Sequence, residues 1–263
     1  MRHIITLLFL LLAGAPLLAQ PRFVQEFRSA RNDRAVAVQQ VENKEYLMLS
    51  QRFGLTGPDS FGINLTKMSD LGRLRWSRDF DFHFPVQGGD LARWAEQTAY
   101  LVSATSAVDS VRDHILIRFN ILGFPVWMKR LGHENSVQTE NGSRSRILPL
   151  ADSVFVVAAG AESIASDTAA NDILLAKLDA EGNLVWSRRY CFSCLGNFDA
   201  TLGDLLQTSD GGFLISGALK TDAPSGLRQE ALLIKTDSEG QLSWARSYAV
   251  ASSALNFTLN AAN

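Results

Sequence analysis

Cys191 and Cys194 are the residues whose chemistry is easiest to test from the sequence, because they form the segment Cys-Phe-Ser-Cys. A c-type haem site needs a His directly after the second Cys, but Leu195 stands there. A zinc site needs further ligands at suitable spacing, and the nearest His is the distant His133. A thioredoxin-like pair needs a helix that follows a strand, whereas this segment is predicted to be a loop. We therefore favour a local disulfide, which an oxidising compartment would maintain.

Four basic residues at equivalent places could suggest an anion-binding ring: Lys67, Arg118, Lys177 and Lys235. Because the position repeats along the chain, we favour a structural role, in which each side chain lies beside a tryptophan of its own repeat. His83, His114 and His133 match no metal-binding spacing and are predicted to lie on the surface or in loops. No residue pattern predicts a catalytic site, a bound cofactor or a metal site.

The elements that position these residues belong to an internal repeat. The pattern basic-x-polar-x-x-Gly-x-x-x-Trp occurs four times, at intervals of roughly 50 to 60 residues. Its glycines are Gly72, Gly123, Gly182 and Gly240, and its tryptophans are Trp76, Trp127, Trp186 and Trp244. Chance does not align so many positions four times, so the chain consists of four similar units.

Each unit is predicted to contain two β-hairpins. In the second hairpin, the first strand is apolar on both faces and the second strand alternates with period two. The repeated Gly lies in the turn between them with a positive φ, and the repeated Trp fills the gap between units, largely buried. The first hairpin is clearest at 203–219, where Asp210 and Gly211 suit a two-residue turn.

Four antiparallel strands per unit predict an all-β chain that forms the blades of a β-propeller. The blade region is expected to cover residues 20–248, with blades at about 28–80, 88–131, 143–190 and 200–248. Residues 22–27 have the pattern of an outermost blade strand, and residues 249–263 that of the start of an incomplete further blade. Neither segment completes a blade, so we expect an open arc, and we expect the natural protein to continue beyond Asn263.

The repeat resembles the bacterial β-propeller repeats of the SBBP type, which occur in large secreted and surface proteins. The segment from Asp204 to Tyr248 follows their pattern closely, whereas the copy at 135–190 lacks the Asp-Gly-Gly turn. The resemblance implies the fold and an extracellular binding or scaffolding role. Residues 176–186 are also similar to the tryptophan-docking motif of quinoprotein propellers. However, their Asp stands three residues before the Gly instead of four, and the sequence lacks a vicinal Cys pair.

The N-terminus predicts export of the protein. A basic start at Arg2 and His3 precedes an apolar run, and a cleavage point follows at Ala19, so residues 1–19 are predicted to be a signal peptide. The apolar run is too short for a membrane span, so we expect no transmembrane segment in the mature chain. The formal net charge of −2 lacks the basic excess that a nucleic-acid partner would favour.

The connections between the predicted strands differ on the two faces of the blades. Turns within the hairpins are short, whereas the second-to-third-strand loops and the blade-to-blade loops are long, polar and dissimilar. We call their side the long-loop face. Because variable loops on a rigid scaffold commonly carry binding, we expect this face to bind a protein or glycan. The leading hypothesis is an exported, non-catalytic binding or display module. A quinoprotein-like dehydrogenase and a lectin-like carbohydrate-binding propeller are the alternatives.

Overall fold

The computed structural model describes most of the predicted blade region. The described residues are 33–53, 61–82, 86–108, 111–131, 145–162, 170–196, 198–223, 226–248, 255–257 and 261–262. The predicted signal peptide and the predicted strand at 22–27 lie outside these residues. So do several segments predicted to be long loops, namely 54–60, 132–144 and 163–169.

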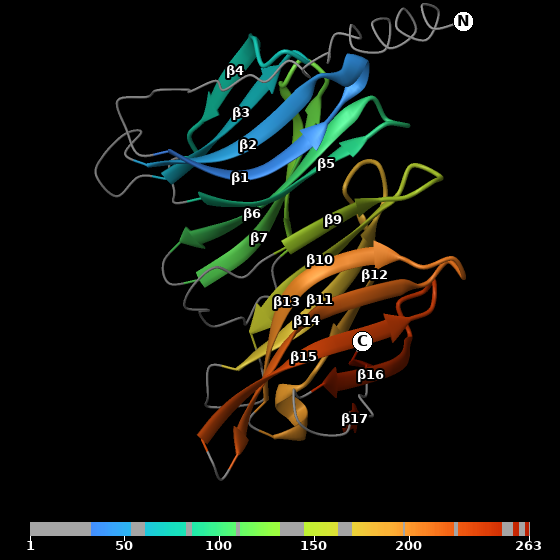
Figure 1. Ribbon diagram of the computed structural model, residues 1–263. Coiled ribbons are helices and arrows are strands. Elements are labelled where there is room, and N and C mark those ends of the chain that lie inside the picture. Colours follow the sequence, from blue (N-terminus) through green and yellow to red (C-terminus); the bar gives the residue numbers. More distant parts are fainter. Residues whose placement is uncertain are drawn as a thin grey trace, which may run out of the picture.

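The described chain is all-β, as the repeat predicts, with two short 3-10 turns, η1 (Glu42–Lys44) and η2 (Ser193–Leu195). Four antiparallel sheets follow one another, and in each the strands pair in chain order (Figure 1). The first sheet contains β1 (Asp33–Gln40), β2 (Tyr46–Phe53), β3 (Phe61–Met68) and β4 (Leu74–Phe80). The second contains β5 (Val86–Trp94), β6 (Ala99–Val108), β7 (Val111–Asn120) and β8 (Pro125–Leu131).

The third sheet contains β9 (Ser145–Pro149), β10 (Phe155–Glu162), β11 (Asn171–Leu178) and β12 (Leu184–Tyr190). The fourth contains β13 (Phe198–Gln207), β14 (Phe213–Ala223), β15 (Gly226–Thr236) and β16 (Leu242–Tyr248). The first strands of successive sheets, β1, β5, β9 and β13, lie next to one another along the inside of the array. The sheets therefore have the arrangement of propeller blades, and they form an open arc instead of a closed ring.

The C-terminal residues differ from their expected arrangement. We expected 249–263 to begin the inner strand of a further blade. Instead, β17 (Leu255–Phe257) pairs with β16, and β18 (Ala261–Ala262) pairs with β12. Both are short fifth strands on the outer edges of existing sheets, where an unpaired edge offers free backbone hydrogen-bonding groups. Alternation in the sequence indicates a strand, but it does not say which edge the strand joins.

The turn of each second hairpin is built as the residue types indicate. Gly72, Gly123, Gly182 and Gly240 have φ values of 74°, 78°, 75° and 73°. In the third blade, the Asp179 carboxylate accepts hydrogen bonds from the backbone N–H groups of Glu181 and Asn183. Asp237, Asn120 and Ser69 accept equivalent bonds in the other three blades. A side-chain acceptor before the turn and a residue with positive φ within it therefore close the hairpin locally.

The core consists of three apolar layers between successive sheets. Trp76, Trp127 and Trp186 each reach from the outer strand of one blade to the turn glycine of the next. Trp186 is buried, with 8% of its surface exposed, but Trp76, Trp127 and Trp244 are only half-buried. None of the four is exposed, as predicted, but they are not equally buried, and Trp186 lies deepest. The outermost strands of twisted sheets fan apart, so water reaches the outer part of each layer.

The turn glycines also give the tryptophans space. A Cβ atom at Gly123 would lie 2.6 Å from Cη2 of Trp76, which is too close for any side chain. We expect Gly123→Ala to cost about 3 kcal/mol in the free energy of unfolding, because about 1–2 kcal/mol of backbone strain adds to this clash. The measurement is urea unfolding of the mature chain.

Gly211→Ala is the matched control for this prediction. Gly211 has a φ of 83°, but a Cβ atom there would meet only Ser238, at 4.0 Å. It should therefore cost only the backbone strain, about 1–2 kcal/mol. Equal losses of stability in the two variants would contradict the blade-to-blade role of Gly123.

Candidate functional site

The four repeated basic residues do not form a ring of free cations. Each stands directly opposite its own repeat's Trp in the strand register, for example Lys67 opposite Trp76. The cation over the Trp ring is nevertheless a different one. It is the Arg two residues after the Trp, on the same side of the outer strand: Arg78, Arg188 and Arg246, at 5.7, 5.8 and 5.2 Å from the ring centres. The register therefore places each basic residue beside its repeat's Trp, as predicted, but the cation over that ring comes from the outer strand. Arg118 instead lies 5.6 Å from the ring centre of Trp94 in its own blade, and Lys67 and Lys235 bind other groups.

Those other groups are mostly supplied by neighbouring strands. The Lys67 ammonium lies 3.1 Å from a Glu45 oxygen and 3.2 Å from the Tyr100 hydroxyl of the next blade. Burial alone would lower the pKa of Lys67, but the hydrogen bonds with Glu45 and Tyr100 outweigh it and leave the pKa raised. Arg118 donates to the Ala180 carbonyl of the third blade at 3.2 Å. Lys235 pairs with Asp210 at 2.9 Å. Lys67, Arg118 and Lys235 thus bind separate groups and do not share a common anion site.

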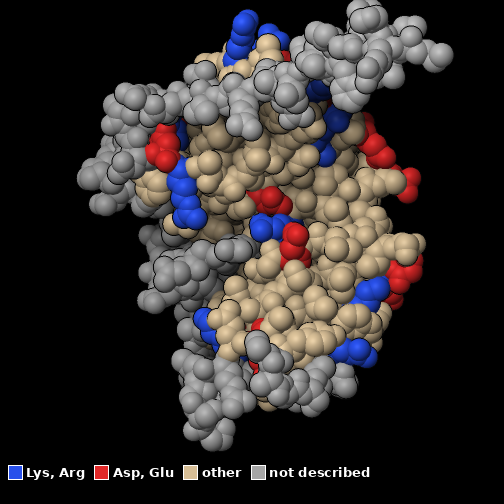
Figure 2. Space-filling view, viewed as in Figure 1, with Lys and Arg blue, Asp and Glu red and all other residues tan. Residues whose placement is uncertain are grey.

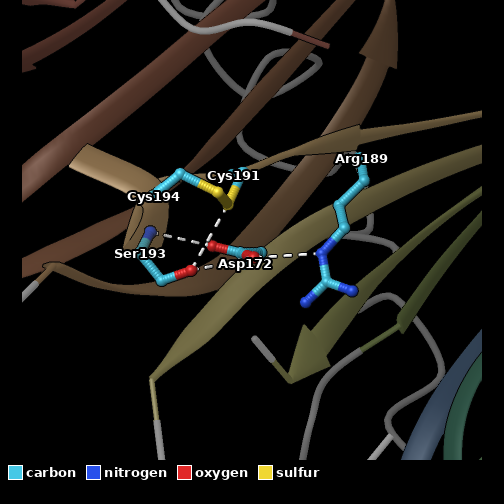
Figure 3. Close-up of a disulfide and its surroundings, with 5 residues drawn as sticks. All are labelled: Asp172, Arg189, Cys191, Ser193 and Cys194. Atoms are coloured by element: carbon cyan, nitrogen blue, oxygen red, sulfur yellow. Dashed lines mark hydrogen bonds and ion pairs between the residues drawn. A yellow bond between two sulfur atoms is a disulfide. The ribbon is translucent and has the colours of Figure 1, made fainter. Parts of the chain in front are cut away.

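Cys191 and Cys194 form a disulfide that ties η2 to the end of the third blade, at the start of the connection to the fourth (Figure 3). Cys191 is buried and Cys194 is exposed. Between them, the Ser193 backbone N–H and hydroxyl donate to the two Asp172 carboxylate oxygens at 3.0 and 3.2 Å. The disulfide thus closes a turn that is also hydrogen-bonded to the adjacent sheet.

Asp172 is the centre of this arrangement and has no exposed side-chain surface. Its second partner is Arg189, whose Nε donates to Oδ2 at 3.0 Å, as Figure 3 shows. Arg189 is itself only 11% exposed. A buried carboxylate is tolerable only when its charge is paired and its oxygens accept hydrogen bonds, and both conditions hold here.

The same register carries a polar pair in every blade, which the sequence analysis missed. The pairs are Arg52 with Asp79, Asp113 with Arg130, Asp172 with Arg189, and Glu230 with Ser247. In each blade one partner stands three residues after the repeated Trp on the outer strand. That spacing was visible in the sequence, but the partner lies on another strand. In the first blade the outer strand also carries the acid, Asp79, whereas the second and third blades carry an Arg there. Beside the long-loop face, three of these pairs join the third and fourth strands, and Arg52 of the first blade joins the second strand to the fourth.

A second feature lies on the inside of the arc, where the first strands of all four blades line an open hollow of about 470 Å³. Figure 2 shows acidic and basic side chains side by side in the middle of this face, surrounded by largely uncharged surface. Asp90, Arg146 and Asp204 line the hollow together with apolar residues such as Val36 and Leu148. The Arg146 guanidinium Nε lies 3.3 Å from Oδ1 of Asp204. No pattern in the sequence marks these residues as a site.

His114 is the histidine that the prediction misplaced. It lies in β7 and is buried, with its ring Nε2 2.7 Å from the Gly160 carbonyl of the third blade, so it is neither a surface nor a loop residue. His83 and His133 lie outside the described residues. Burial lowers the pKa of His114, because a charged imidazolium would lose its hydration.

This shift predicts a loss of stability in mild acid. The folded-state pKa of His114 lies below the unfolded value, so the unfolded chain takes up the proton first as the pH falls. The contribution of His114 is therefore complete above an unfolded pKa of about 6.5 and declines below it, approaching about 1.4 kcal/mol per pH unit. Urea unfolding between pH 7.5 and pH 5 should show this slope in the wild type, and His114→Gln should reduce it. An unchanged slope in the variant would exclude His114 as its source.

The described residues contain no group of three or more His, Cys, Asp or Glu side chains that could hold a metal ion. Among the helices of the same part of the chain, none is long and apolar enough to cross a membrane. No protein-family pattern matches the chain, and no curated protein is significantly similar to it.

Proposed function

We propose that this protein is an exported, non-catalytic β-propeller module, with repeats of the SBBP type, that binds or displays partners through its long-loop face. The observation that carries the proposal is the asymmetry of the connections. Within the described blades, the first-to-second-strand and third-to-fourth-strand turns are short and closed by local hydrogen bonds. On the opposite side, the connections at 54–60, 132–144 and 163–170 are long and differ in sequence. The second-to-third-strand connections of the second and fourth blades were also predicted to be long, but this was wrong: β6 and β7 pair up to Val108 and Val111, and β14 and β15 up to Ala223 and Gly226, so only two residues join them.

The strand ends beneath that face are joined by polar and covalent cross-links. The polar pairs that recur in each blade lie at the end of the outer strand on this side: three join it to the start of the third strand, and Arg52 of the first blade joins it to the end of the second strand. In the third blade, the disulfide and the Asp172 hydrogen bonds add a covalent and a polar anchor. Binding loops on a rigid base lose less conformational entropy when a ligand orders them. The partner classes that fit this design are extracellular proteins and glycans.

The test compares two faces of one molecule. The loop at 163–169 is replaced by a Gly-Ser segment of equal length, and a control protein carries Glu239→Ala in a short turn on the opposite face. Each mature protein is immobilised and exposed to whole cells, isolated envelope fractions and glycan arrays. We expect the wild type and the control to retain the same ligands and the loop variant to lose at least one of them.

Two outcomes would reject the proposal. One is capture that depends on the short-turn face and survives replacement of the loops. The other is enzymatic turnover: dye-linked oxidation of alcohols or sugars after addition of pyrroloquinoline quinone and calcium, above the activity of the untreated protein, would favour a quinoprotein-like dehydrogenase.

A further inference from the structure

The charged residues of the inner hollow occupy one register of the repeat. Asp90, Arg146 and Asp204 stand opposite Ser103, Ala158 and Ser216 in the second strands of their blades. The first blade has Ala37 at this position, opposite Leu49. The residue that follows each charged residue in the sequence, such as Leu91 after Asp90 or Ile147 after Arg146, is buried in the core. An alanine therefore satisfies the fold at this position, and the charges in the other three blades need another explanation.

The backbone directs the two carboxylates toward the hollow. The pairing of β5 shifts register between Gly88 and Asp90, and that of β13 shifts between Leu202 and Asp204. In both strands a glycine occupies the bulge directly before the acidic residue, and a Cβ at Gly89 would lie 2.4 Å from the Ser145 hydroxyl oxygen. β-Bulges commonly redirect a side chain next to a functional site.

Arg146 and Asp204 bind each other but can still form hydrogen bonds with a ligand. The Asp90 carboxylate accepts a hydrogen bond from the Ile147 backbone N–H of the neighbouring blade at 2.9 Å, and burial raises its pKa. Arg146 donates from Nε to Asp204 and from Nη1 to the Ser145 carbonyl. Oδ1 of Asp204 also accepts from Leu205 N–H, while 75% of the Asp204 side chain remains exposed. A guanidinium donor and a carboxylate acceptor therefore face solvent side by side.

We propose that the inner hollow binds a neutral saccharide through adjacent hydroxyl groups. One hydroxyl donates to the Asp204 carboxylate and its neighbour accepts from the Arg146 guanidinium, while apolar residues such as Val36 and Leu148 contact the C–H surface of the ring. The two acids beside one Arg disfavour an anionic ligand, and Arg146 disfavours a cationic one. The volume of about 470 Å³ falls in the range of small-ligand sites. This site is separate from the long-loop face.

The experiment measures binding of glucose, galactose, mannose, N-acetylglucosamine and their disaccharides to the mature chain by saturation-transfer NMR and calorimetry. Glucosamine and glucuronate serve as charged comparators. We expect at least one neutral sugar to bind at concentrations up to about 10 mM. Arg146→Gln and Asp204→Asn should each weaken its binding by about tenfold or more, because each removes a hydrogen bond with a charged group. Asp152→Asn, at an exposed turn of the third blade outside the hollow, should leave binding unchanged.

Three results would overturn the proposal: no binding of any neutral sugar in this range, tighter binding of glucosamine or glucuronate, or neutral-sugar binding that both hollow variants retain. Unfolding curves of the variants establish that they are folded, which we expect because both side chains lie at the surface of the hollow. Replacement of the 163–169 loop should not alter this binding. The saccharide site and the proposed function of the long-loop face can therefore fail independently.

Discussion

Trp186→Ala should lower the free energy of unfolding by about 3–5 kcal/mol, the range for removing a buried aromatic side chain. Trp186 is the buried member of the repeated tryptophans, and its ring lies 6.3 Å from that of Phe213 in the fourth blade. Its edge also fills the space at Gly240, where a Cβ atom would lie 2.7 Å from it. The substitution therefore opens a cavity in the apolar layer that joins the third blade to the fourth.

Trp244→Ala is the matched control for Trp186→Ala, because Trp244 occupies the same repeat position but is half-buried on the last blade. We expect its loss to be well under half that of Trp186→Ala, with the two compared by urea unfolding. A repeat array is stabilised mainly by contacts between neighbouring units, so an interior layer should matter more than an end. Equal effects would show that the blades are not coupled through these tryptophans.

Asp172→Asn should cost about 3–5 kcal/mol, because it removes the fully buried negative charge that the Arg189 guanidinium binds. The same change weakens the acceptor of the Ser193 N–H and hydroxyl, which holds the disulfide turn on the third sheet. Thermal and urea unfolding measure the loss, and hydrogen exchange of the Ser193 amide should increase. The double variant Asp172→Leu with Arg189→Met removes both charges and should recover part of the stability.

The second blade supplies a control for Asp172. Asp113 and Arg130 occupy the equivalent positions, but the Arg130 side chain is 55% exposed. Asp113→Asn should therefore cost about 0–1 kcal/mol, as for other exposed ion pairs. A loss as large as that of Asp172→Asn would mean that repeat position, and not burial, sets the effect.

The two predictions locate the stability of the arc in different interactions. Trp186 acts between blades, whereas Asp172 acts within one blade at the base of the long loops. A variant of Trp186 should thus affect the docking of neighbouring sheets, and a variant of Asp172 should first affect the loops beside the disulfide. Hydrogen exchange can separate these cases because it reports local opening as well as global unfolding.

The sequence by itself determined the parts of the fold that depend on neighbours along the chain. Strand alternation, the turn glycines and the acceptors before them act over a few residues, so they predict the hairpins wherever they occur. Their fourfold recurrence then predicts four similar sheets and an open arc.

Only the tertiary structure decided which distant side chains meet. Lys67 turns to Glu45 and Tyr100 instead of the Trp76 ring, and His114 is buried against Gly160 of another blade. Asp90, Arg146 and Asp204 come from three blades and share one hollow because the packing of the sheets brings one register of the repeat to the inside of the arc. Burial and charge pairing at these places depend on the packing between sheets, which no local pattern encodes. The repeat specifies each blade, and the spacing between the blades creates the candidate sites.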